Sequence, residues 1–413
     1  MKKLGLFAIG LCMSATTLAQ TLKVHIGAVT VAVPAAKAGD MVYGAGGTDL
    51  TIMGKTYAIS AIDSITVDNS VVADSSVFVT YKGNTAHVLL SGDIAPKMNV
   101  NVVGADVSAV AALDLQSEVR YTLTGKSEDG SFFMDGEYKA RVELRNLDLT
   151  NADGAAIDIA NGKRIDIVLP TGTTTRLADG AGGLHKACFF VNGHPEFGGG
   201  GTLYLTGNSK HAFASDEYTR IKHTFGKLKV VKAVGDGLHI EQYFLQQGGM
   251  IDVQNTQGDC VDVSVTKNPA DLNNGQVFIE AGKMKLMVMA DDTKGLKCDS
   301  AMTISGGDIE AGVAGLGTKG LSVGGNLLIQ QKTATPTNIR MVVTGSTYMP
   351  GDPVLQSKCR GIKGKGNLLF DGGKIEISAT GKGSKAVSID GVFTYLNGTY
   401  NCAIEDINGI HMQ

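Results

Sequence analysis

A five-residue motif, the pentad, recurs from residue 155 onward, and its spacing restricts the fold more than any other feature of the sequence. Each copy has a small second residue and an apolar third residue, as in "KGLKC" and "KGLSV". The steps between third residues are 32, 24, 25, 23, 35, 25, 41 and 25, for Ile157, Phe189, Phe213, Leu238, Val261, Leu296, Leu321, Ile362 and Val387. Polar insertions after Thr266 and Lys332 account for two of the long steps. A recurrent period of this length indicates stacked repeats.

The segments that follow the pentads are short strands. "KIEIS" and "MIDVQ" alternate apolar and polar residues with a period of two, and glycines precede them. Stacking such strands about 4.8 Å apart pairs their backbone groups and buries a continuous core. Propeller repeats are longer, and leucine-rich repeats need a Leu/Asn frame. We therefore predict an all-β chain in which residues 100–413 form a right-handed, single-stranded parallel β-helix.

The small second residue fits this fold, because coils approach closely at a tight inner corner. Composition agrees with many short strands and sharp turns, since the chain has 55 glycines, 8 prolines and no tryptophan. The cysteines that follow residue 19 are odd in number and widely scattered, which argues against a disulfide framework or a zinc motif. We predict buried thiols at Cys188, Cys260, Cys298, Cys359 and Cys402.

The first 99 residues lack the pentad. Residues 1–19 combine two lysines, a short apolar run and small residues before Gln20, which predicts a secretory signal peptide. We expect an exported protein, in the periplasm, at the cell surface or outside the cell. No segment is apolar for long enough to predict a membrane span. Residues 20–99 alternate like antiparallel strands and are predicted to cap the open end of the helix or attach it to a cell-surface partner.

Charge argues against nucleic acid as a partner. Without Lys2 and Lys3 the chain has 35 basic and 40 acidic residues, so its net charge is −5. Nucleic-acid-binding domains usually carry a basic surface.

The first residue of the pentad is charged in the later coils, and identical positions in neighbouring coils lie about one strand spacing apart. Asp236 and Asp259 are the acidic members. Stacked like charges need a counterion, and calcium takes the hard oxygen ligands that aspartates offer. We predict calcium at Asp236 and Asp259 with contributions from Asp291 and Asp292; the alternative is a solvated corner where Asp favours the turn.

The basic members of this row are expected to face a different counterion, either an internal acid such as Asp299 or the carboxylates of a ligand. Charge-assisted hydrogen bonds from Lys and Arg to carboxylates are strong. The predicted substrate-binding residues, which form a basic stripe along the helix, are Lys294, Lys319, Arg360 and Lys385. A solvated charged face is the alternative.

Several segments resemble a known family. The run "VELRNLDLTNADGAAIDIANGKRIDIVLPTGTTTRLADG" is similar to the opening coils of bacterial carbohydrate-binding-domain proteins with a pectate-lyase-like β-helix, and "GDGLHI", "GDCVDV" and "ADDTKGLKCDSAMTISGGDIEA" resemble their recurring Asp-Asp-Gly-Ile coils. The resemblance covers roughly residues 100–413. It implies non-catalytic binding of an acidic, polygalacturonate-like polysaccharide, with calcium at coil-corner aspartates. "YAISAIDSITV" resembles a segment of secreted proteins from the Bacteroides group.

Two other functions remain open from the sequence. Pectate lyases resemble this fold and use calcium with a basic residue near clustered aspartates, but no dense group of these residues stands out within one coil region, so no catalytic residue is predicted. A surface adhesin or structural spike without a glycan ligand is the second alternative. The scattered histidines are interpreted as structural: His185, His194, His211 and His239. Because tryptophan is absent, electrostatic recognition of an acidic glycan is favoured over stacking on a neutral one.

Overall fold

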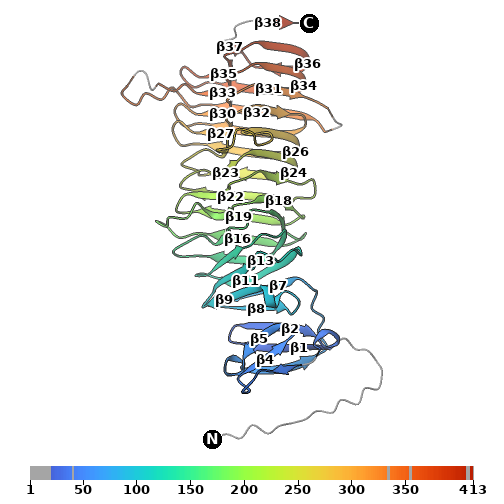
Figure 1. The fold of residues 1–413 in the computed structure, drawn as a ribbon. Helices are drawn as coiled ribbons and strands as arrows, with labels where there is room; N and C mark the ends of the chain where they lie inside the picture. The colour runs from blue at the N-terminus through green and yellow to red at the C-terminus, as the bar shows by residue number, and fades with distance from the viewer. Residues whose placement is uncertain (1–19, 40, 333–334, 353–355, 406–409, 413) are drawn as a thin grey trace.

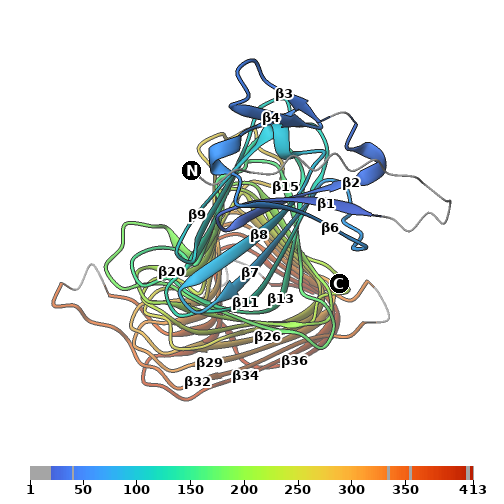
Figure 2. The ribbon, with the colours of Figure 1, turned by 90° about the horizontal axis from the view of Figure 1, so that it is seen from below.

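The computed structural model describes residues 20–39, 41–332, 335–352, 356–405 and 410–412. The predicted signal peptide, residues 1–19, lies outside this part of the chain. Coils stack into a column, with the N-terminal β-region at one end and the last strands at the other (Figure 1). Viewed along its axis, the coils overlie one another and their sheets form the walls of a prism (Figure 2). No helix in the described ranges is long and apolar enough to cross a membrane.

The pentads form one wall, which we call the pentad sheet. Its 13 strands are β9 (Met98–Val103), β10 (Asp106–Ala111), β12 (Ser131–Asp135), β14 (Ile157–Ile159), β17 (Ala187–Val191), β20 (His211–Ser215), β23 (Leu238–Glu241), β25 (Val261–Ser264), β27 (Lys294–Cys298), β30 (Lys319–Val323), β33 (Arg360–Gly364), β35 (Lys385–Ile389) and β37 (Ile404–Glu405). Apart from the antiparallel β9–β10 pair, neighbours in this sheet are parallel.

The other two walls belong to one 22-stranded sheet that bends around a corner. Its long strands run through the corner: β11 (Val119–Ser127), β13 (Ala140–Thr150), β24 (Tyr243–Val253), β26 (Gln276–Val288), β34 (Leu368–Ala379) and β36 (Phe393–Asn401). Their first halves form the second face with β7 (Ser76–Lys82), β15 (Arg164–Val168), β18 (His194–Gly198), β21 (Thr219–Ile221), β28 (Met302–Ile304), β31 (Leu327–Gln330) and β38 (Ile410–Met412). Their second halves form the third face with β16 (Thr174–Ala178), β19 (Thr202–Gly207), β22 (Lys227–Ala233), β29 (Gly307–Val313) and β32 (Thr337–Val343).

The pentads stack in the register that their pattern predicts. The third residue of each copy pairs directly with the third residue of the next, from Ile157 with Phe189 through to Ile362 with Val387. All nine of these side chains are fully buried. The long insertions leave this register intact. The predicted all-β parallel β-helix is therefore confirmed.

Close contact between coils explains the small second residue. A Cβ added at Gly320 would lie 2.6 Å from the carbonyl oxygen of Gly361 and 2.5 Å from Met341 Sδ. At Gly237 the carbonyl oxygen of Cys260 would be 2.5 Å away. Real Cβ atoms do not approach oxygen so closely, so glycine is required at these corners. All five cysteines from Cys188 onward are free, and four of them are buried; Cys402 is half-buried.

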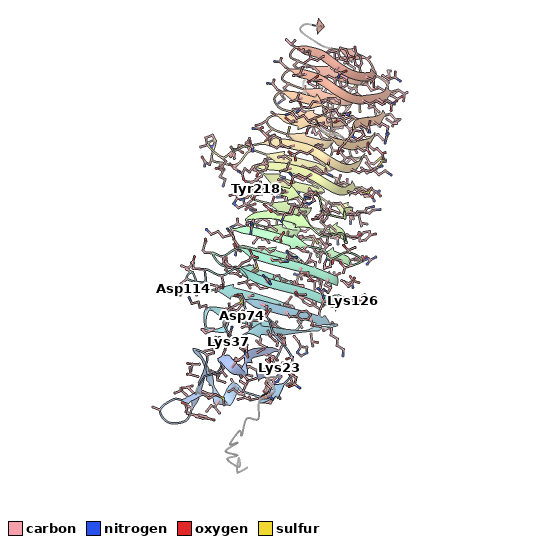
Figure 3. The ribbon with its side chains drawn as sticks, turned by 90° about the vertical axis from the view of Figure 1, so that its right-hand side faces the viewer. Lys23, Lys37, Asp74, Asp114, Lys126 and Tyr218 are labelled. Carbon is pink, nitrogen blue, oxygen red and sulfur yellow. The ribbon has the colours of Figure 1, made fainter. Side chains whose placement is uncertain are left out.

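The N-terminal β-region is continuous with the helix. Its elements are β1 (Thr21–Ile26), β2 (Val29–Pro34), η1 (Ala35–Lys37), β3 (Val42–Tyr43), β4 (Asp49–Ile52), β5 (Lys55–Ala58), η2 (Ile59–Ala61), β6 (Ser64–Asp68), β8 (Thr85–Ser91) and η3 (Ala95–Lys97). Strand β2 pairs with β8, which pairs with β7, and an ion pair of 2.6 Å joins Lys37 to Asp74 (Figure 3).

Parallel pairing begins before the boundary that the sequence suggested at residue 99. Strand β7 already pairs in parallel with β11 from Ser76, and β9 crosses residue 99. The hairpins β7–β8 and β9–β10 have the alternation of apolar and polar residues that is typical of isolated antiparallel strands. Their role as the first turn of the column is therefore not visible in the sequence. The function of residues 20–99 as a cap or attachment stays a prediction.

Candidate functional site

The four aspartates predicted to bind calcium are held mainly by neighbouring coils. Asp236 Oδ1 accepts the N–H of Asp259 at 2.7 Å, and Asp259 Oδ1 accepts the N–H of Lys294 at 2.7 Å. Asp291 Oδ1 accepts the N–H of Leu316 at 2.8 Å. These carboxylates thus accept hydrogen bonds that connect one coil to the next. Burial raises the pKa of Asp259 to about 6.

Asp292 makes a different kind of contact, because its Oδ1 accepts a hydrogen bond from the Ser357 side-chain hydroxyl at 2.7 Å. Among the described residues, no three of the four predicted aspartates form a group whose ligand atoms lie within 4.8 Å of one another. Calcium at these positions stays a prediction.

The basic stripe is aligned, and three of its side chains, those of Lys294, Lys319 and Arg360, donate hydrogen bonds to the protein. Lys294 pairs with Lys319, Lys319 with Arg360, and Arg360 with Lys385. Lys319 Nζ donates to the carbonyl of Gly317 at 2.9 Å and to Ser357 Oγ at 2.6 Å, and burial lowers the pKa of Lys319.

Arg360 is only 5% exposed, and its guanidinium donates to the carbonyls of Cys359 and Gly383 at 2.7 and 3.3 Å. Lys294 Nζ donates to the Asp292 carbonyl. These cations of the basic stripe therefore donate hydrogen bonds to backbone carbonyls in the loops beside the pentad sheet. Binding of the stripe to a ligand stays a prediction.

A second row of charges runs along the outside of the third face, and we call it the charged row. Each member pairs with the next, coil by coil: Lys126, Asp148, Arg176, Tyr204, Lys229, Asp252, Lys285, Glu310, Arg340, Glu376 and Asn401. Apart from Tyr204 and the final Asn401, positive and negative residues alternate. Alternation removes the repulsion that a row of like charges would create.

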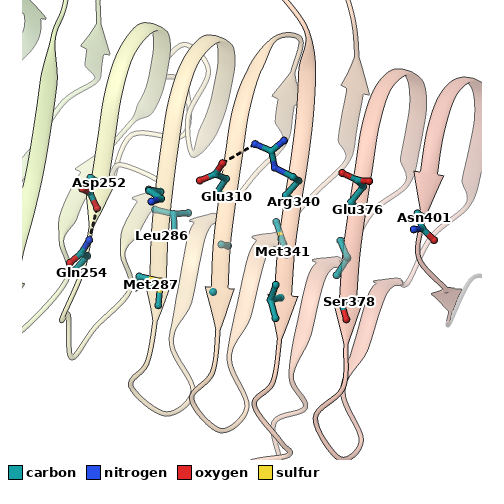
Figure 4. Close-up of a pocket in the computed structure, with 15 residues that line it drawn as sticks. Asp252, Gln254, Leu286, Met287, Glu310, Arg340, Met341, Glu376, Ser378 and Asn401 are labelled. Carbon is teal, nitrogen blue, oxygen red and sulfur yellow. Dashed lines mark hydrogen bonds and ion pairs between the residues drawn. The ribbon is translucent and has the colours of Figure 1, made fainter.

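The last six members of the charged row line a groove of about 710 Å³ (Figure 4). They extend over five coil steps, or about 24 Å at a strand spacing of 4.8 Å. The groove is lined by Asp252, Gln254, Lys285, Leu286, Met287, Glu310, Ala311, Gly312, Arg340, Met341, Val342, Glu376, Ile377, Ser378 and Asn401. A groove of this length suits an extended chain better than a compact small molecule.

Beside the charges the groove has an apolar strip. Met287, Gly312 and Val342 are paired across β26, β29 and β32, and the two side chains are 41% and 55% exposed. Gly312 makes the hollow between them, because a Cβ there would lie 3.0 Å from Met287 Sδ. Polar groups on one side and exposed apolar groups on the other match a ligand with hydroxyls and C–H faces.

Ion pairs among the described residues of the groove leave Lys285 without an acidic partner. Glu310 Oε1 lies 3.0 Å from Lys283 Nζ and 2.8 Å from Arg340, whose hydrogen bonds lower the pKa of Glu310. Asp252 lies 2.9 Å from Lys227. Both neighbours of Lys285 in the charged row are thus already paired, and within the described chain the exposed Lys285 ammonium has no acid at ion-pair distance.

Comparison with known proteins places the chain in a family. The family described as carbohydrate-binding domain-containing protein matches residues 111–406. The chain belongs to this carbohydrate-binding family. Among solved structures, the polysaccharide lyase-like protein from C. thermocellum, a gadolinium derivative, is similar, with a TM-score of 0.50 and 21% identity over 62% of this chain and 96% of that chain. This likeness supports the β-helix fold of the carbohydrate-binding family member. No curated protein sequence matches the chain.

Sequence reasoning missed the groove because it followed the pentads alone. The groove residues lie on the strands after the pentads, where Lys285, Glu310, Arg340 and Glu376 occupy one outward row. Aligning "MKLMV", "GDIEAGV", "NIRMVV" and "KIEISA" on their buried residues would have revealed this alternation of charge.

Proposed function

We propose that the protein is an exported, non-catalytic carbohydrate-binding protein that holds an extended polysaccharide in the groove of the third face. The observation that carries the proposal is the exposed Lys285, which has no acid at ion-pair distance among the described residues and lies beside the apolar strip of Met287 and Val342. Family membership supports a carbohydrate ligand. The groove offers hydrogen-bonding side chains from Gln254, Ser378 and others for sugar hydroxyls.

We further propose that the polysaccharide is acidic and polygalacturonate-like. Lys285 and Arg340 lie two coils apart, about 10 Å at the usual strand spacing, and both extend from the same row. Carboxylates of a uronic-acid polymer form charge-assisted hydrogen bonds with such groups. Calcium at the predicted aspartates remains part of this proposal as an element that holds coil corners together, separate from the groove.

A lyase is the alternative that the groove supports less well. Glu310 is the acid at its centre, but two cations hold it ionised and lower its pKa, so it is a poor proton donor near neutral pH. Lys285 is the available base, but its two acidic neighbours in the charged row, Asp252 and Glu310, are already held in ion pairs. Incubation with polygalacturonate and calcium is expected to give no unsaturated, ultraviolet-absorbing product; steady product formation that disappears in Lys285→Ala would establish a lyase.

Binding to polygalacturonate and to a neutral glucan is compared by calorimetry for Lys285→Glu and the wild type. A charge-assisted hydrogen bond contributes about 1.5–3 kcal/mol, so polygalacturonate binding should weaken roughly 10- to 100-fold. Lys163→Glu is the matched control, because Lys163 is a half-exposed lysine away from the groove that pairs with Glu137. Wild-type affinity in Lys285→Glu would remove the groove from the proposal, and absence of glycan binding in the wild type would favour the adhesin.

A further inference from the structure

The two outward rows that line the groove continue beyond it, toward the N-terminal end of the column. The groove begins on the coil of β24, with Asp252 of the charged row and Gln254 two positions later (Figure 4). From Asp252 the charged row continues coil by coil through Lys229 and Tyr204 to Arg176. The residues two positions after each member form the second row, which supplies the apolar strip of the groove. The coils before the groove therefore present the same pair of rows.

A second hollow of about 240 Å³ lies on these two rows, and we call it the upstream hollow. It is lined by Asp148, Thr150, Arg176, Leu177, Ala178, Tyr204, Thr206 and Val231. Its last coil is that of β22, which pairs with β24, where the groove begins. The upstream hollow and the groove together cover ten strands that pair in succession, from β13 to β36. Nine steps at the usual strand spacing give a track of about 43 Å.

A small residue makes the upstream hollow, as Gly312 does in the groove. Ala178 occupies the second row and pairs with Thr150 on one side and Thr206 on the other. The threonine hydroxyls can donate and accept hydrogen bonds with sugar hydroxyls. Val231 adds an apolar group that is 39% exposed. Hydroxyl and apolar groups thus lie side by side here, as polar and apolar groups do in the groove.

Arg176 supplies a cation that the described residues leave without an acidic partner. The side chain is exposed, and its guanidinium carbon lies 5.0 Å from the centroid of the Tyr204 ring. Asp148, the neighbouring acid in the charged row, lies 3.6 Å from Lys126 instead. Contact with an aromatic ring orients the planar guanidinium, whose N–H groups match the two oxygens of a carboxylate.

Arg176 and Lys285 belong to the same row and are four coil steps apart, or about 19 Å. The acid between them in the row is Asp252, which lies 2.9 Å from Lys227 and 3.9 Å from Lys229. Two lysines thus neutralise this single carboxylate. A polyanion that follows the row from Arg176 to Lys285 passes over a neutralised acid and meets a cation at each end.

We propose that the upstream hollow is a second glycan subsite, in which Arg176 binds a carboxylate of the same acidic polysaccharide chain that occupies the groove. This inference rests on the proposed function, because it takes the ligand of the groove to be an extended uronic-acid polymer. The subsite places a sugar ring over Ala178, between the threonine hydroxyls and Val231. A chain that reaches both Arg176 and Lys285 makes its second contact intramolecularly, so it binds more tightly than a chain that reaches only one of them.

Binding of decagalacturonate and of trigalacturonate is measured by calorimetry for the wild type, Arg176→Ala and Lys285→Glu. The trisaccharide is too short to reach both cations. We therefore expect the wild type to bind the decasaccharide at least about tenfold more tightly than the trisaccharide. In Arg176→Ala this preference for the longer chain should fall about tenfold, with the wild-type circular dichroism retained.

Arg164→Ala is the matched control. Arg164 is also an exposed arginine of the 22-stranded sheet, but it lies on the second face and pairs with Glu118 at 3.4 Å. Its preference for the decasaccharide should equal that of the wild type.

The three possible failures have different meanings. If Arg176→Ala keeps the wild-type preference while Lys285→Glu weakens binding, the second subsite is overturned and the groove alone holds the glycan. If Lys285→Glu binds the decasaccharide with wild-type affinity, the groove is removed from the proposed function and the two-point contact is overturned with it. If the wild type binds neither oligosaccharide, the proposed acidic glycan and the subsite both fail.

Discussion

Replacing Gly320 by alanine tests whether close coil contact, and not chain flexibility, explains the small second residue of the pentad. The new Cβ would lie 2.6 Å from the Gly361 carbonyl oxygen and 2.5 Å from Met341 Sδ. The methionine side chain can move, but the carbonyl is held in the parallel ladder between β30 and β33. Overpacking of this kind costs about 1–3 kcal/mol.

Alanine also reduces the entropy of the unfolded chain, which offsets about 0.4–1 kcal/mol of that cost. We therefore expect Gly320→Ala to lower the free energy of unfolding by about 1–2 kcal/mol. The measurement is urea denaturation followed by circular dichroism, with the slope of the transition compared as well as its midpoint, because repeat proteins can lose cooperativity.

Gly162→Ala provides the control, since its Cβ would find nothing nearer than Asn192 Nδ2 at 3.6 Å and the residue is exposed. This variant should match the wild type or be slightly more stable. If Gly320→Ala is as stable as Gly162→Ala, coil contact does not set the second residue, and the explanation from packing fails.

Two further predictions concern the sites expected from sequence. Replacing Lys319 and Arg360 together with alanine should weaken binding to polygalacturonate if the basic stripe contacts the glycan. The double variant should also have a free energy of unfolding about 1–3 kcal/mol lower, because buried carbonyls such as that of Gly383 lose a hydrogen-bond donor. Unchanged binding in the folded variant would remove the stripe from the site. Millimolar calcium should raise the thermal midpoint of chelator-treated protein, and no shift would count against calcium at Asp236 and Asp259.

The fold could be predicted because the pentad fixes both the period and the face of each coil. Once Leu238 and Val261 are recognised as equivalent, a parallel ladder that pairs them follows, and every later pair follows in the same way. Insertions such as the one after Thr266 interrupt the spacing but not the pattern. The start of the column could not be predicted, because β7 and β8 carry the same alternation as a free hairpin.

The direction of a charged side chain was beyond the reach of the pattern. Equivalent positions predict that Asp236, Asp259, Lys319 and Arg360 stack, but not whether each side chain extends into solvent or folds back onto a loop. Asp259 accepts a backbone N–H and Arg360 donates to carbonyls because the loops between coils leave unpaired groups there. Loop geometry varies from coil to coil, so it cannot be predicted from the periodic part of the sequence.

The contact between His211 and His239, whose rings stack with centroids 4.6 Å apart, could have been recognised from the sequence. His211 holds the first position of its pentad and Asp236 holds the same position in the next, a spacing of 25 residues that the repeat makes adjacent. Treating each histidine as an isolated residue concealed this. His239 enters from the fourth position, which alternates to the outside of the same strand.

A parallel β-helix places every outward residue one strand spacing from its equivalents above and below, so each row of charges must be neutralised. The first pentad position does so through hydrogen bonds with main-chain groups and through the ion pair of Lys319 with Asp292. The charged row of the third face does so by alternation of sign. In the charged row, Lys285 is not neutralised by its neighbour Glu310, because Glu310 already forms ion pairs with Lys283 and Arg340. Within the described part of the groove, Lys285 is thus a cation with no acid at ion-pair distance, and a ligand carboxylate would supply the missing charge.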